Sequence, residues 1–131
     1  MNYDKERKTI EEYLVANFST LPMRFANPKS KSFENIEFVH IEIISGESEK
    51  ITFGSLTNTF RYVGLITCQI FIKLGQGSGP ALVIADELST ILSDKQISNV
   101  VTNASRIDKI GPQDDYYQIN VVTRFKRDEN F

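Results

Sequence analysis

The segment from Phe60 to Leu92 constrains the fold most strongly, because it joins a long alternating strand to an amphipathic helix through a glycine-containing turn. Pro80 suits the first position of the helix, and apolar residues then repeat at three- and four-residue intervals as far as Leu92. Side chains alternate across a strand, so we expect its even positions to face the core. These positions hold Phe60, Tyr62, Gly64, Ile66, Cys68, Ile70 and Ile72.

The glycine turn resembles a nucleotide-binding loop but lacks its chemistry. A P-loop needs Lys and then Ser or Thr after its glycines, whereas Gly75, Gly77 and Gly79 are followed by Pro80 and Ala81. The spacing also differs from that of a dinucleotide-binding fingerprint. Amides at a helix start can bind an anion without lysine, although Pro80 removes one of them. A flexible turn is the main interpretation, and a small phosphate ligand bound by Gly75–Gly79 is an alternative.

Four segments precede the long strand. Helical spacing predicts a first helix from Tyr3 to about Phe18. Two prolines and small polar residues over 22–34 predict a short extended piece and then a surface loop. Alternation predicts a strand over Asn35–Ser45, and the short β-prone stretch after Gly46 predicts an arm or an edge hairpin.

The C-terminal third predicts further strands. Residues 97–111 suit one or two short strands with a bend near Asn103. The run from Tyr116 to Lys126 predicts a final long strand, and the charged residues after it predict a frayed tail.

Together these elements predict an α+β fold in a single domain over residues 1–131. We expect two helices packed on one face of a mostly antiparallel or mixed sheet, plus a β-arm. Two strands carry apolar side chains on both faces, which predicts that the arm or another subunit covers part of the second face and favours an oligomer. The apolar residues of that face are Ile36, Phe38, Ile44, Val63, Leu65 and Phe71.

Charge and hydropathy limit the classes of partner. The chain has 15 Lys+Arg against 17 Asp+Glu, a net charge of -2. Phosphate binding depends mainly on Lys and Arg, so specific nucleic-acid binding is disfavoured. No apolar run suits a secretion signal or a membrane span, so we expect a protein of the cytosol with no membrane partner.

No residue pattern predicts catalysis, a metal or a cofactor. His40 and Cys68 are the only residues of their types, and both lie within predicted strands, so we interpret them as structural. Adjacent carboxylates point in different directions on a helix or strand, so none is a ready-made acid-base pair. The pairs are Glu11 with Glu12, Asp86 with Glu87, Asp114 with Asp115 and Asp128 with Glu129.

Several short motifs, taken in order, resemble bacteriophage tail-terminator proteins of the minor tail protein U type. They are RYVG (61–64), CQIF (68–71), GQGSGPA (75–81), IADELSTIL (84–92) and DDYYQINVVTRFKRDE (114–129). The resemblance implies an α+β subunit that forms a hexameric ring on the last ring of tail-tube protein and stops its polymerisation. It also implies a surface for a head-completion protein, no catalysis, and a place in the virion tail after assembly in the host cytoplasm. Another head-tail connector or a tube-like virion subunit is the alternative.

The arm and the start of the long strand predict a subunit interface. Ile51 and Phe53 are apolar residues beside a polar loop, and Arg61 and Tyr62 belong to residue types enriched at interfaces. We therefore expect these four residues to contact a neighbouring subunit.

Overall fold

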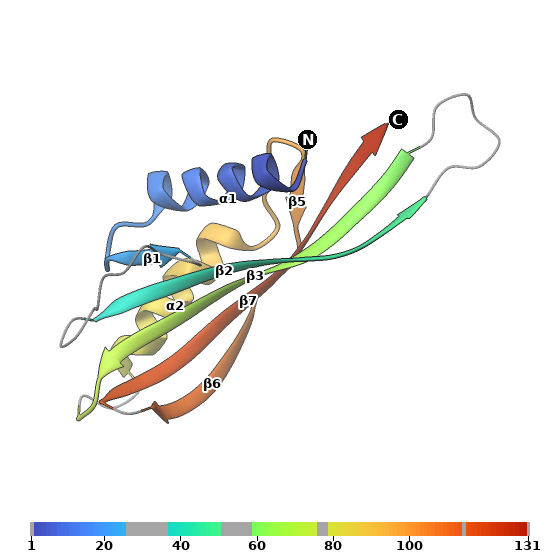
Figure 1. The fold of residues 1–131 in the computed structure, drawn as a ribbon. Helices are drawn as coiled ribbons and strands as arrows, with labels where there is room; N and C mark the ends of the chain where they lie inside the picture. Colours follow the sequence, from blue (N-terminus) through green and yellow to red (C-terminus); the bar gives the residue numbers. More distant parts are fainter. Residues whose placement is uncertain (1, 26–36, 51–58, 76–78, 114, 131) are drawn as a thin grey trace.

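Two helices lie on one face of a long, twisted sheet (Figure 1). The computed structural model describes residues 2–25, 37–50, 59–75, 79–113 and 115–130. The helices are α1 (Tyr3–Asn17) and α2 (Gly79–Leu92). The strands are β1 (Met23–Phe25), β2 (Phe38–Lys50), β3 (Thr59–Lys73), β4 (Gln96–Ile97), β5 (Val100–Thr102), β6 (Arg106–Gln113) and β7 (Tyr116–Asn130). The α+β fold is confirmed.

The described strands form one mixed sheet in the order β1-β2-β3-β7-β5-β4. β1 pairs parallel to β2, and every other pair is antiparallel. β6 and β5 share the outer edge of β7, so β7 pairs with three strands. The predicted bend near Asn103 separates β5 from β6, but the region holds three strands rather than one or two.

Both predicted helices form, and each buries one stripe of apolar residues. The side chain of Asn2 caps α1 by accepting a hydrogen bond from the Lys5 amide at 2.8 Å. α1 buries Ile10 and Leu14 against the sheet. α2 buries Ala81, Ile84, Ala85, Leu88 and Leu92.

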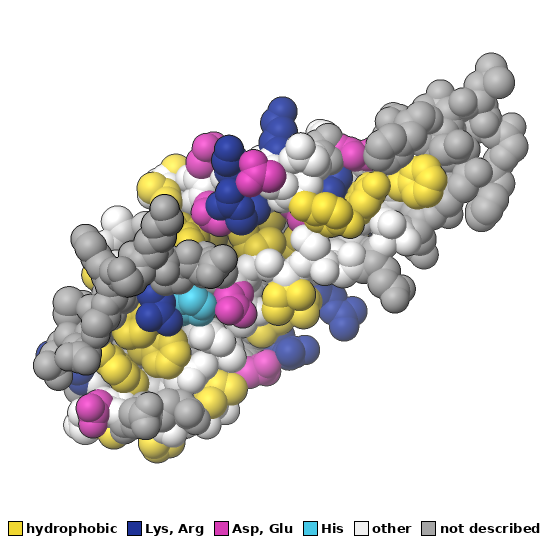
Figure 2. Space-filling view, viewed as in Figure 1, with side chains coloured by type: hydrophobic (Ala, Val, Ile, Leu, Met, Phe, Trp, Pro, Cys, Tyr) yellow, Lys and Arg dark blue, Asp and Glu magenta, His cyan; other side chains and the backbone are white. Residues whose placement is uncertain are grey.

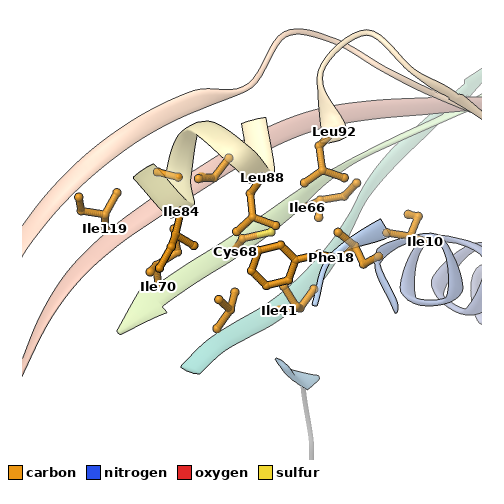
Figure 3. Packing of buried hydrophobic residues seen from close by; sticks show 14 of the residues in the cluster. Ile10, Phe18, Ile41, Ile66, Cys68, Ile70, Ile84, Leu88, Leu92 and Ile119 are labelled. Carbon is orange, nitrogen blue, oxygen red and sulfur yellow. The ribbon is translucent and has the colours of Figure 1, made fainter. Parts of the chain in front are cut away.

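One core lies between the helices and the sheet (Figure 3). In β3 the buried positions from Ile66 to Ile72 are the even ones, which confirms the predicted face. Val39 and Ile41 of β2 and the odd positions of β7 complete this layer. We call it the core face, and the opposite side of the sheet the open face.

An arm extends beyond the helical layer (Figure 1). β2 and β3 stay paired as far as Lys50 and Phe60, and β7 runs beside β3 until Asn130 pairs with Thr59. The arm therefore has three strands in its described part. Ile51 and Phe53 fall in 51–58, outside the described residues.

The prediction of a frayed C-terminal tail was wrong. β7 continues to Asn130, and Arg127 is only 2% exposed. The charge of the residues after Lys126 led to the prediction that they are exposed. In the structure they alternate across a paired strand and form ion pairs with residues of opposite charge. Likewise β2 runs on to Lys50, beyond the predicted end at Ser45, because β3 pairs with it past the irregularity between Ser45 and Ser48.

Candidate functional site

A buried ion pair joins α1 to the base of the arm. The Nε of Arg127 lies 2.7 Å from Oε1 of Glu6, and both side chains are 1% exposed. The hydroxyl of Ser45 donates to the other carboxylate oxygen of Glu6 at 2.9 Å. Nη1 of Arg127 also lies 3.4 Å from Oε2 of Glu129. These bonds tie α1, β2 and β7 together where the arm leaves the body.

Two tyrosines sit beside this ion pair. The guanidinium of Arg127 lies 4.2 Å from the ring centroid of Tyr62 and 5.4 Å from that of Tyr3. The tyrosine rings meet edge to face, with 5.7 Å between their centroids. Tyr62, a predicted interface residue, therefore packs against α1 on the core face of its own chain.

Arg61 points to the open face, opposite its neighbour Tyr62. Its Nε and Nη2 donate to the two carboxylate oxygens of Asp128 at 2.9 and 3.2 Å. These hydrogen bonds lower the pKa of Asp128 below its ordinary value, and the positive charges of Arg61 and Lys126 lower it further. The structure thus brings two of the four predicted interface residues to the base of the arm, on opposite faces of β3.

Asp128→Asn is expected to lower the free energy of unfolding by roughly 0.2–1 kcal/mol at neutral pH, since the ion pair is partly exposed and screened by solvent. A carboxyl group whose pKa is lower in the folded state stabilises the folded protein, and this contribution is complete at pH values above the pKa of the unfolded chain, about 3.9 for aspartate. That contribution is lost as the pH falls through the lower folded pKa. Urea unfolding at neutral and strongly acidic pH tests this: a difference between wild type and variant that persists in strong acid would contradict the assignment.

The open face carries an apolar groove next to the base of the arm. Ile44 is 50% exposed and Val63 is 41% exposed. They line a shallow groove of about 420 Å³, with Leu65 beside them and Arg124 and Lys126 among its other lining residues. The sequence signal for this surface was the presence of apolar residues on both faces of β2 and β3.

The opposite end of the open face is covered by the chain itself. Phe38 and Phe71 stack with ring centroids 4.8 Å apart, and Tyr116 meets both rings edge to face. The guanidinium of Arg24 lies 5.2 Å from the centroid of Phe38, which is 6% exposed. Side chains of β1, β2, β3 and β7 thus bury one another on this part of the open face. The expected covering by the arm or by another subunit stays a prediction.

His40 has a structural place in the same region. Arg24 Nε donates to His40 Nδ1 at 3.1 Å, so Nδ1 acts as an acceptor, and Nε2 lies 3.4 Å from a carboxylate oxygen of Glu42. Figure 2 shows the histidine between a basic and an acidic side chain. The ring is 8% exposed and both its nitrogens have partners.

Cys68 lies fully buried in the core, and burial raises the pKa of its thiol to about 12. A thiol in this state is a small apolar residue and not a nucleophile. Among the described residues no three His, Cys, Asp or Glu side chains gather as a metal site requires. Neither α1 nor α2 has the length and apolar character needed to cross a membrane.

The glycine turn is described only at its ends. Gly75 has φ +93°, a conformation that favours glycine, and Gly79 begins α2. Residues 76–78 lie outside the described part of the chain. The phosphate-ligand alternative remains a prediction.

Sequence reasoning missed the ion pair between Glu6 and Arg127. Two signals could have found it. Glu6 lies four residues before Ile10, which lies four before Leu14, so the carboxylate falls on the buried stripe of α1. Arg127 continues the odd positions that β7 buries up to Phe125.

Comparison with known proteins identifies the fold alone. No protein family matches the chain, and no curated protein matches it. Among the solved structures that match, one of a protein with no named function superposes with a TM-score of 0.70 at 16% sequence identity. The match covers 97% of this chain and 96% of that one, so the two share nearly the whole architecture.

Proposed function

We propose that this chain is a structural virion protein, a phage tail terminator. In this role it forms a hexameric ring that caps the tail tube, stops its polymerisation and offers a joining surface to a head-completion protein. The ring assembles in the host cytoplasm and becomes part of the virion tail. The motifs between Arg61 and Glu129 support this proposal through their resemblance to tail terminators.

The observation that carries the proposal is the arm with the open groove at its base. Three strands extend past the helical layer, and Ile44 and Val63 remain exposed beside them. A projecting ribbon next to an exposed apolar surface suits a subunit that packs against copies of itself and a tube. The only histidine and the only cysteine both serve structural roles, which favours an assembly protein over an enzyme.

The test measures the mass of the purified protein by light scattering across a concentration series, and then its effect on tail-tube subunits by electron microscopy. A terminator is expected to be a monomer or one discrete ring that halts tube growth and caps tube ends. Open-ended polymers of the chain itself would indicate a tube-like subunit instead. A stable monomer with no effect on tubes would contradict the proposal.

A further inference from the structure

The groove on the open face combines exposed apolar surface with positive charge. Ile44 and Val63 form its exposed floor, and Arg124 and Lys126 lie along β7 at its side. The charge of Lys126 acts on Asp128 two residues further along β7, but neither basic side chain has a carboxylate within ion-pair distance among the described residues. An apolar surface bordered by such cations suits a partner that presents apolar and acidic groups together.

The outer side of α2 has these complementary properties. Val83 is 69% exposed, and Asp86 and Glu87 follow it three and four residues later, so the three side chains share one side of the helix. We call these three residues the α2 stripe. Its negative charge is not neutralised within the helix, because α2 contains no basic residue. Glu87 accepts hydrogen bonds only from an uncharged group, the Thr20 hydroxyl, among the described residues.

We infer that the α2 stripe of one copy docks into the groove of the next copy. The exposed Val83 meets the apolar floor of Ile44 and Val63, while Asp86 and Glu87 meet the two basic residues of β7. The occupant of the groove is thus a second copy of this chain, selected by matching both charge and apolar character.

The placement of the two surfaces determines the symmetry of this contact. α2 packs on the core face of the sheet (Figure 1). Its buried residues face the sheet, so the α2 stripe points away from it, whereas the groove lies on the open face. A contact between two different surfaces is head-to-tail, and it repeats from copy to copy until a ring closes. The inference rests on the proposed ring and names the surfaces that build it.

The test uses charge reversal at one exposed residue of each surface. Arg124→Glu in the groove and Asp86→Lys in the α2 stripe are each expected to raise the apparent dissociation constant of self-association at least about tenfold. Added salt should also weaken the wild-type contact. Lys5→Glu and Glu12→Lys are matched controls, because both side chains are exposed on α1, which carries neither surface. Sedimentation velocity across a concentration series, with circular dichroism as a check on folding, provides the readout.

Mixing the two variants gives the sharpest result. The groove of the Arg124→Glu variant should accept the stripe of the Asp86→Lys variant, and the reverse contact joins two unaltered surfaces. The mixture should therefore regain the wild-type assembly while each variant alone does not. If the Arg124→Glu variant lost assembly while the Asp86→Lys variant kept it, the contact would join two open faces symmetrically, and the inference would be overturned.

The remaining outcomes separate this contact from the function it serves. Wild-type rings unaffected by either reversal would overturn the contact while leaving the terminator proposal intact. Rings built through this contact that fail to cap tubes would instead reject the terminator proposal alone. A wild type that never self-associates would overturn the contact.

Discussion

Arg127→Ala is expected to lower the free energy of unfolding by about 3–5 kcal/mol, because it leaves the Glu6 carboxylate buried without its cation. Both side chains are 1% exposed, so water cannot replace the lost partner. Removing the guanidinium also removes its contacts with the rings of Tyr62 and Tyr3. Domains of this size have about 5–15 kcal/mol of stability, so much of it would be lost. Urea unfolding followed by circular dichroism measures the change.

Two further variants separate the buried pair from ordinary surface charge. Arg61→Ala breaks the partly exposed pair with Asp128 on the same segment of the arm, and it should cost under about 1 kcal/mol. Replacing both buried partners, as Glu6→Leu with Arg127→Met, should recover part of the loss, since Leu in place of Glu6 needs no counter-charge. The recovery is incomplete because Glu129, whose side chain is 14% exposed, still loses the Arg127 guanidinium. If Arg127→Ala cost no more than Arg61→Ala, the buried pair would not stabilise the base of the arm as argued.

Gly64→Ala is expected to destabilise the protein by about 1–3 kcal/mol through overpacking. Gly64 pairs with Phe125 across the sheet, and the aromatic ring occupies the space above it. An added Cβ would lie 2.4 Å from Cζ of Phe125 and 2.6 Å from the carbonyl oxygen of Ile44. The second clash is with backbone, so rotating the ring cannot relieve it and the strands must separate. Thermal and urea unfolding of the variant measure the cost.

A matched control for this substitution is Gly79→Ala at the start of α2. Apart from its neighbours in the chain and the backbone of α2, no described residue has an atom within 4 Å of the added Cβ, so we expect a change within about 0.5 kcal/mol. Adding Phe125→Leu to Gly64→Ala should restore only part of the stability, because the clash with the Ile44 carbonyl remains. A Gly64→Ala variant as stable as wild type would show that the sheet yields easily at the base of the arm.

The sequence was most informative where apolar spacing repeats. The alternation from Ile66 to Ile72 predicted the buried face of β3, and the spacing from Ala81 to Leu92 predicted the buried stripe of α2. It was misleading where charge was taken as a sign of exposure. The C-terminal residues from Arg127 onward were expected to fray, although Arg127 continues the alternation of β7.

The candidate site was predicted only in part, because its contacts join different strands and helices. Arg61 and Tyr62 were predicted to lie at the start of the long strand, but the sequence could not show that Arg61 pairs with Asp128 and that Tyr62 packs against α1. Those partners depend on which strands are neighbours and in which register they pair. The apolar open face was visible in the alternation, whereas its groove depends on β2, β3 and β7 coming together.

Spacing along the chain was enough to predict most of the elements, the faces they bury and the α+β class, because local periodicity decides which side chains of one element point the same way. Features that join distant segments came only from the folded arrangement. Glu6 and Arg127 are 121 positions apart, and the space above Gly64 is filled by a residue of another strand. The same arrangement placed the α2 stripe and the groove on opposite sides of the molecule. Each of these depends on how the strands are ordered and paired, which local periodicity does not specify.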